Sequence, residues 1–290
     1  MKNICLSLVV LTLCPRPSWA IYGPSLERAD VSIAVQSCQE AKFAHSEQVV
    51  DAMHSQSPSE TLGVLGAALR ELKSTPKSSP LYPARAFCIH ELVPARLQPG
   101  GSQYSPSRLE PTATVKQFGE LGIEYFYYDP DDEFTLRNDP VDLIELATDH
   151  QDSPWGRQAF LMMTRLGWSH GACSEGPDQF REVIKHSETF LAHYPDSEVS
   201  DDVRLETAKA YGTWWHVSQL TPQAGGPDDP ARYLQSSREA RRKAIELYHE
   251  YLSSRETADK DVERRLKSLQ ENSMDPSKRD YDYWCPDYED

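Results

Sequence analysis

Three segments of the chain share one pattern of bulky, small and ring-bearing residues, and this repeat restricts the fold more than any other feature. They are Phe118-x-x-Leu121-Gly122-x-x-Tyr125, Met163-x-x-Leu166-Gly167-x-x-His170 and Arg204-x-x-Thr207-Ala208-x-x-Tyr211. Their small residues lie 45 positions (122 to 167) and 41 positions (167 to 208) apart, a period typical of stacked helical repeats. Glycine inside a helix costs about 1 kcal/mol relative to alanine. We therefore expect helices to approach one another closely at these positions.

The first twenty residues have the layout of a secretory signal peptide. Lys2 precedes an apolar run from Ile4 to Cys14, and Ser18-Trp19-Ala20 forms a small-residue cleavage signal. The run is too short to cross a bilayer. Leu13 occupies the position where lipoprotein signals have a small residue, so lipid anchoring at Cys14 is not expected. We expect cleavage near Ala20 and a periplasmic or secreted mature protein.

The composition of the remaining chain argues against several kinds of partner. Nowhere after the signal does an apolar run approach 18 residues, so no transmembrane segment is expected. The formal net charge is −15, and it becomes −17 for residues 21–290 because the signal contributes only Lys2 and Arg16. Such a chain repels phosphate backbones, which argues against nucleic-acid binding.

Four cysteines remain after cleavage, namely Cys38, Cys88, Cys173 and Cys285. In an oxidising compartment they could form two disulfides, and the sequence does not rank the three possible connectivities. Cys88 could instead be an unbonded cysteine that packs in the core as a small apolar residue, because it lies in the run Ala86-Phe87-Cys88-Ile89.

The chain divides by composition into four parts. Residues 1–20 are the signal, and residues 21–111 form a helical region that ends in a proline-rich loop and contains a degenerate copy of the repeat around Gly66. Residues 112–272 hold the repeats with a capping helix, and residues 273–290 form an acidic, aromatic tail. Within the repeats, apolar periodicity predicts helices over 114–128, from Pro140 onward, 153–168, 201–216, 236–252 and 259–272. A further buried helical stripe is expected from Phe180, Val183, Ile184 and Phe190, in a unit that closes at 193–197.

The two expected repeat units end in the same Asp-Ser pair. Gln151-Asp152-Ser153 closes one unit and Pro195-Asp196-Ser197 closes the next. In both, the Asp-Ser pair is expected to cap the helix that follows, because these side chains accept hydrogen bonds from the first backbone N–H groups of a helix.

Together these residues resemble tetratricopeptide repeats, whose first helix carries W-x-x-L-G-x-x-Y and whose units often close with a proline. The segment from His193-Tyr194-Pro195-Asp196-Ser197 through Tyr211 is similar to the unit joint of periplasmic members, such as the BamD-like outer-membrane assembly proteins and the Tol-Pal coordinator. The resemblance covers residues 112–272. It implies an all-α solenoid of helical hairpins with long inter-helix loops, because 28 residues separate Gly167 from Pro195 where the standard unit has 24.

The same resemblance implies a protein or peptide partner in the cell envelope, bound along one face of the first helices. The implied partner-binding residues are Lys116, Ile123, Phe126, Thr164, Trp168, Asp202 and Lys209. For Trp168, and likewise for Trp214 and Trp215, the competing interpretation is packing in the core.

The sequence contains no convincing catalytic, cofactor or metal motif. His90-Glu91 begins like a zinc-protease motif, but Pro94 stands where the second histidine is needed. Asp201-Asp202 lies at a predicted helix start, where acids complement the helix dipole. We therefore expect a non-enzymatic interaction scaffold without a cofactor. Two alternatives stay open: an envelope hydrolase acting on cell-wall material, with its site in residues 21–111 or the adjoining cleft, and an accessory subunit that docks through its tail.

Overall fold

The protein is described here from a computed structural model, which covers residues 31–55, 58–93, 113–127, 135–138, 141–166, 178–220 and 230–273. In these ranges the chain is helical apart from one antiparallel hairpin of two short strands. The predicted signal peptide, the proline-rich loop and residues 274–290 of the tail lie outside the described residues. The expected helical class is confirmed.

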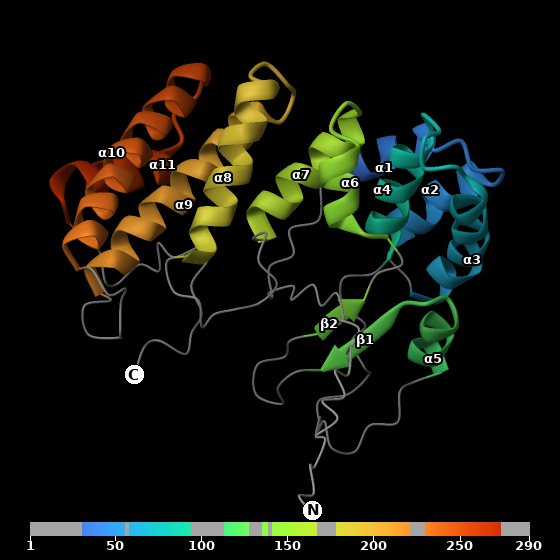
Figure 1. Cartoon of the computed structure of the whole chain (residues 1–290). Coiled ribbons are helices and arrows are strands. Elements are labelled where there is room, and N and C mark those ends of the chain that lie inside the picture. The colour runs from blue at the N-terminus through green and yellow to red at the C-terminus, as the bar shows by residue number, and fades with distance from the viewer. Residues whose placement is uncertain are drawn as a thin grey trace, which may run out of the picture.

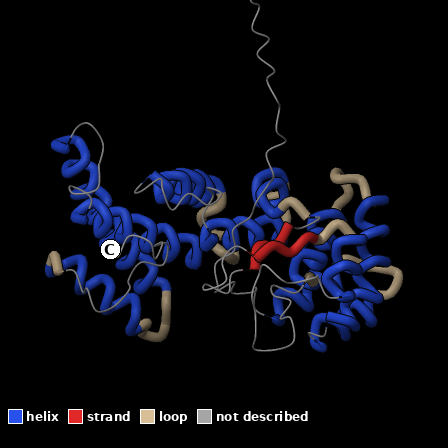
Figure 2. The backbone as a smooth tube through the Cα atoms, turned by 90° about the horizontal axis from the view of Figure 1, so that it is seen from below, coloured by secondary structure: helices blue, strands red, loops and turns tan. Residues whose placement is uncertain are grey.

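The elements follow one another in a row (Figures 1 and 2). The helices are α1 (Val31–Glu40), α2 (Ser46–Ser55), α3 (Pro58–Ser74), α4 (Tyr82–Leu92), α5 (Ala113–Glu120), α6 (Leu143–Asp149), α7 (Pro154–Leu166), α8 (Asp178–His193), α9 (Ser200–Leu220), α10 (Pro230–Ser254) and α11 (Lys260–Glu271), and the strands are β1 (Glu124–Tyr127) and β2 (Thr135–Asn138).

Helix α4 is the centre of the N-terminal part. Nine of its eleven residues are buried, and it packs against α1, α2 and α3 on one side and α6 and α7 on the other. A disulfide between Cys38 and Cys88 joins α1 to α4, and both residues are fully buried. Cys88 is therefore both disulfide-bonded and buried. The two interpretations offered for it from the sequence are both correct.

Aromatic contacts and a hydrogen bond join the N-terminal helices to α7 and to the turn before it. The Phe87 ring of α4 lies 5.6 Å from the Trp155 ring of α7, and Trp155 Nε1 donates to Glu40 Oε2 of α1 at 3.0 Å. The Tyr82 ring lies 5.2 Å from that of His150, between α6 and α7. The hydrophobic core therefore continues from α4 into α7.

The prediction of one helix over residues 114–128 is wrong for the second half of that range. Helix α5 ends at Glu120, and Gly122 adopts φ +85°, a left-handed conformation that glycine tolerates best. The Ile123 N–H donates to the Phe118 carbonyl at 3.0 Å and the Gly122 N–H to the Gly119 carbonyl at 2.9 Å, which is the Schellman pattern of a helix C-terminus. In this copy the glycine ends a helix, and strand β1 follows.

The later helices agree with the predicted periodicity. Phe180, Val183 and Phe190 of α8 are buried as one stripe. Helix α11 begins after Asp259, whose side chain accepts from the N–H groups of the next turn, and ends at Asn272 in a left-handed conformation. The pairing of helices is less regular than expected, because α8 packs mainly on α9 and makes little contact with α7.

Side-chain bonds tie the short turns between helices to one another, and we call this set the joint ladder. Tyr194 Oη donates to Asp152 Oδ1 at 3.1 Å, linking the α8–α9 turn to the α6–α7 turn. The next link consists of Ser254 Oγ to Asp201 Oδ2 at 2.9 Å and Arg255 Nη2 to Asp202 Oδ1 at 3.0 Å, between the end of α10 and the start of α9. The turns lie along the upper edge in Figure 1.

The two predicted Asp-Ser caps differ in the structure. Ser153 Oγ accepts from the Gly156 N–H at 3.0 Å and caps α7 as expected. Helix α9 begins later, at Ser200, so Ser197 is too far upstream to cap it. The Ser197 hydroxyl instead lies 2.8 Å from Ser200 Oγ.

Gly156 is required by the tight α6–α7 turn. An ideal Cβ on this residue would lie 1.9 Å from the backbone oxygen of His150, which cannot move without opening the turn. We expect Gly156→Ala to lower the free energy of unfolding by about 2 kcal/mol through overpacking. The control is Gly63→Ala in α3, where the added Cβ meets nothing within 4 Å, so the helix should gain up to about 1 kcal/mol. Urea unfolding measures the free energy of unfolding of both variants. Equal values for the two would contradict the close packing described for Gly156.

The Cys38–Cys88 disulfide closes a loop with a sequence separation of 50. Restricting the unfolded chain over this length contributes about 4 kcal/mol to stability. We expect the double variant Cys38→Ala/Cys88→Ala to lose roughly that amount in urea unfolding under non-reducing conditions. Peptide mapping without reduction should recover the linked pair. Recovery of both cysteines as free thiols in protein purified under non-reducing conditions would contradict the assignment.

Candidate functional site

Three of the seven predicted partner-binding residues have side chains that reach solvent. Lys116 is exposed on α5, and Asp202 and Lys209 are half-buried on α9. Asp202 lies at the helix start and pairs with Arg255 in the joint ladder. These three residues come from two helices at different places along the row.

The other four are buried or lie outside what can be described. Ile123 and Thr164 are fully buried, and the Thr164 hydroxyl donates to the Phe160 carbonyl at 2.9 Å. Neither side chain faces solvent. Trp168 lies outside the described residues, as does the side chain of Phe126.

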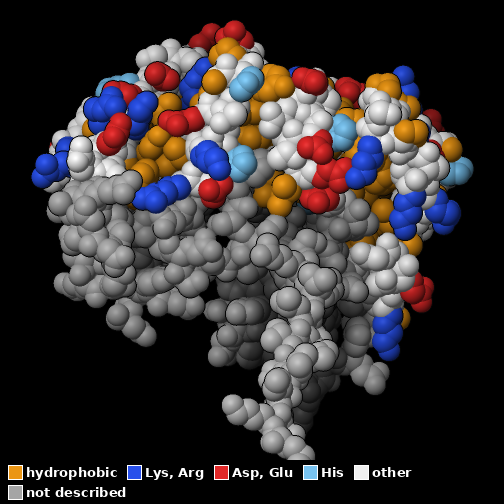
Figure 3. All heavy atoms as spheres, in the orientation of Figure 1, with side chains coloured by type: hydrophobic (Ala, Val, Ile, Leu, Met, Phe, Trp, Pro, Cys, Tyr) orange, Lys and Arg blue, Asp and Glu red, His pale blue; other side chains and the backbone are white. Residues whose placement is uncertain are grey.

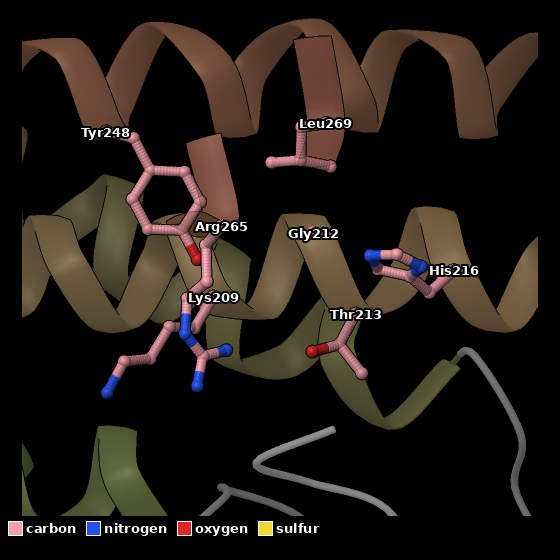
Figure 4. A pocket seen from close by; sticks show the side chains of 7 residues that line it. All are labelled: Lys209, Gly212, Thr213, His216, Tyr248, Arg265 and Leu269. Atoms are coloured by element: carbon pink, nitrogen blue, oxygen red, sulfur yellow. The ribbon is translucent and has the colours of Figure 1, made fainter. Parts of the chain in front are cut away.

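A small polar pocket opens between α9, α10 and α11 (Figure 4). Its volume is about 10 Å³, measured as the space open to the centre of a water molecule, which is the room that about one water needs. Lys209 is the predicted residue that lines it. The full lining consists of Lys209, Gly212, Thr213, His216, Tyr248, Arg265 and Leu269.

The spacing of residues along α9 explains one wall of the pocket. Lys209, Thr213 and His216 are separated by four and three positions, so they share one helical face. Gly212 lies beside them and leaves room for α10 and α11. An ideal Cβ there would lie 3.8 Å from Leu269 Cδ1 and 4.0 Å from the Tyr248 hydroxyl. The glycine thus lets these two side chains approach the α9 backbone.

Charged residues surround this wall. Lys209 Nζ lies 3.2 Å from Glu206 Oε1, and Arg165 Nε of α7 lies 3.5 Å from the same oxygen. Glu206 is only 5 % exposed, so its carboxylate is buried between two cations. The Arg165–Glu206 ion pair therefore links α7 to α9, next to the lining residue Lys209.

Arg265 enters the pocket from α11 and is paired by a neighbouring acid. Asp261 Oδ2 accepts from Arg265 Nε at 2.9 Å, and Asp261 Oδ1 accepts from Arg264 Nη2 at 2.6 Å. Hydrogen bonds from Arg264 and then Arg265 lower the pKa of Asp261 to about 2. The acid therefore stays ionised at neutral pH and orients the guanidinium of Arg265.

Thr213 differs from the other polar residues of the pocket. It is 2 % exposed, and its hydroxyl has no hydrogen-bond partner among the described residues. Figure 4 shows this hydroxyl directed toward the side of Lys209 and Arg265. A buried hydroxyl without a partner is costly, so Thr213 marks the pocket as a place that can receive a polar group.

Among the residues that line the pocket, Lys209 was predicted from the sequence as a binding residue, and the other six were not. A polar stripe at 209, 213 and 216 on α9 was the available signal. Tyr248 and Arg265 lie 39 and 56 positions beyond Lys209 (209 to 248 and 209 to 265), and no periodicity connects residues across that distance.

Tryptophans of α9 contribute packing beside the pocket. Trp215 is buried, and the Arg241 guanidinium lies 5.6 Å from its ring centre. Trp214 is partly buried against the core, under the Arg181 guanidinium at 5.3 Å. Both tryptophans therefore serve the core, as the core-packing interpretation predicts.

Other chemistry-bearing groups do not form a second site in the described part of the chain. His90 and Glu91, adjacent in α4, are each 3 % exposed, with His90 Nε2 and Glu91 Oε1 4.0 Å apart. The described residues include no group of three or more histidine, cysteine or acidic residues placed to hold a metal ion. Among them, no helix is long and apolar enough to cross a membrane.

Comparison with models of protein families, with curated proteins and with solved structures finds no match to this chain. The resemblance to tetratricopeptide repeats therefore stays a prediction, carried by the chain's own residues.

The unpartnered hydroxyl of Thr213 predicts a stabilising substitution. Thr213→Val keeps the shape and removes the buried polar group, so it should raise the free energy of unfolding by about 1 kcal/mol. The matched control is Thr207→Val on the same helix, where the hydroxyl donates to the Val203 carbonyl at 2.6 Å and its loss should destabilise. Thermal and urea unfolding compare the two. A loss of stability for Thr213→Val equal to that of Thr207→Val would contradict this description.

Proposed function

We propose that this chain is a non-enzymatic protein–protein interaction scaffold, built as a tetratricopeptide-like solenoid of helical hairpins and acting in the periplasm or after secretion, in cell-envelope assembly. The observation that carries the proposal is the joint ladder. It ties successive helix pairs at their turns, as in the pair Tyr194 and Asp152, and so supports an extended row of helices. Rows of this kind present long surfaces to protein partners.

The described surface favours a polar mode of recognition. Val31 is the one large hydrophobic side chain that is well exposed among the described residues. Acidic and basic side chains are interspersed over the face seen in Figure 3. A partner would therefore bind these residues through hydrogen bonds and charges more than through an apolar groove.

Export is supported by the Cys38–Cys88 pair. Disulfides persist in oxidising compartments such as the periplasm and the extracellular space. The pair agrees with the signal peptide expected over residues 1–20, and we propose that the mature chain begins at Ile21.

Site-specific photocrosslinking in the native envelope tests the scaffold function. A photoreactive amino acid is placed at Lys116 of α5 or at Lys209 of α9, two of the positions predicted to bind a partner, and in the control at Glu250, which is exposed on α10. We expect one partner protein to be crosslinked from the first two positions and much less from the control. The purified partner should then bind the mature chain with defined stoichiometry.

Two outcomes would overturn the proposal. One is equal crosslinking from Glu250 and the two test positions, which indicates random collision. The other is turnover of cell-wall material by the purified mature chain, which would favour the hydrolase alternative.

A further inference from the structure

We propose that one side of α10 is a docking surface for the acidic, aromatic tail of the same chain, residues 280–290. We call this surface the arginine face, and it consists of Arg238, Arg241, Arg242, Ile245 and His249. Three observations carry the inference: the charge of the face, the point where α11 ends, and the composition and length of the tail. The inference does not depend on the scaffold function.

The spacing of the five residues places them on one side of α10. Positions 238, 241, 242, 245 and 249 follow one another at intervals of three and four when neighbouring turns are compared, which is the spacing of a single helical face. Arg238, Arg242 and His249 are exposed, and Ile245 is half-buried. Another side of the helix, which includes Ala240, Ala244 and Tyr248, is buried. The arginine face is therefore available to a ligand.

The face is basic although the chain is acidic. Residues 238–249 contain four lysines or arginines and two glutamates, a formal charge of +2 in a chain of −15. Arg242 pairs with Glu246 and lies 3.6 Å from Glu239. Arg238 forms no ion pair or hydrogen bond with any described residue. Its guanidinium can therefore pair with an incoming carboxylate without breaking a contact described here.

The tail starts beside this face. Helices α10 and α11 lie side by side at one end of the row (Figure 1). Arg241 Nε donates to the Leu269 carbonyl at 2.7 Å, and Arg241 Nη2 donates to the Gln270 carbonyl at 3.0 Å. Gln270 Nε2 also lies 3.2 Å from His249 Nε2. The last turn of α11 thus follows the edge of the arginine face, and the chain continues from there.

The composition of the tail matches the face. Residues 280–290 include five acids and no lysine or arginine, so their formal side-chain charge is −5. Carboxylates form charge-assisted hydrogen bonds with guanidinium groups. Four aromatic residues alternate with the acids, namely Tyr281, Tyr283, Trp284 and Tyr288. Aromatic rings attract guanidinium groups, as they do where Arg241 lies 5.6 Å from the Trp215 ring centre.

The tail is long enough to cover the face. Eleven residues of helix from position 238 to 249 extend about 16 Å. Residues 274–279 can bridge up to about 20 Å from the end of α11, and residues 280–290 can span up to about 36 Å when extended. The acids can therefore reach Arg238 and Arg242 without any change in the helices.

Photocrosslinking of the mature full chain tests the docking. A photoreactive amino acid replaces Tyr283, and chains labelled with nitrogen-15 are mixed with an equal amount of unlabelled chains before irradiation. We expect mass spectrometry to find the crosslink in the peptide that contains residues 238–249, with both halves from one chain. Arg238→Glu/Arg242→Glu should lower the yield about threefold to tenfold, because exposed ion pairs contribute up to about 1 kcal/mol each.

The control is Lys73→Glu/Lys185→Glu, which makes the same change in charge at exposed positions of α3 and α8. Its crosslink yield should equal that of the unchanged chain. Adding Asp280→Arg/Asp282→Arg to Arg238→Glu/Arg242→Glu exchanges the two signs and should restore the yield. Circular dichroism verifies the folding of each variant. If the double reversal on α10 does not fold, Arg238→Glu decides alone.

Four results would overturn the proposal. Crosslinks that join labelled to unlabelled chains would show that the face receives the tail of a second copy. Crosslinks spread over other helices would show that the tail has no fixed docking surface. An equal loss of yield in Lys73→Glu/Lys185→Glu would show a response to net charge alone, and failure of the exchanged charges to restore the yield would exclude pairing between the acids and the arginines.

Discussion

The arrangement of helices α6 to α10 depends on close contact at the turns between them. At the α6–α7 turn, Gly156 packs directly on the backbone of His150, and the Ser153 hydroxyl caps the new helix. This turn places Asp152 where Tyr194 of the next turn can reach it. Since each turn is bonded to its neighbour, the direction of one helix pair constrains the next, and the bonds at Asp201 and Asp202 continue the constraint to α10.

The same constraint places the pocket. Helix α9 lies between α8 and α10, and its start is held by Ser254 and Arg255. With that end fixed, Gly212 in the middle of α9 faces Tyr248 and Leu269 at van der Waals distance. The small residue allows three helices to converge, and the neighbouring Lys209 and Thr213 line the pocket beside it. A chain expected to act only through a long surface therefore also has a compact polar site.

Glycines illustrate how one residue type supports different structures. Gly122 looked like the best mid-helix glycine, yet its positive φ ends α5 because the Schellman bonds satisfy the last carbonyls. Gly156 matched no template but has the tightest backbone contact among the described glycines. Glycine removes a side chain and widens the allowed φ, and the sequence alone does not indicate which property is used.

The sequence by itself determined the helical class, most helix positions after residue 141, the cap at Ser153 and the stripe of α8. These depend on local periodicity and on capping chemistry within a few residues. Only the tertiary structure decided that Cys88 pairs with Cys38, that α8 packs on α9 more than on α7, and that Ile123 and Thr164 turn inward. It also brought Lys209, Tyr248 and Arg265 together. Such contacts join residues dozens of positions apart, and they depend on how whole helices pack, which no local pattern encodes.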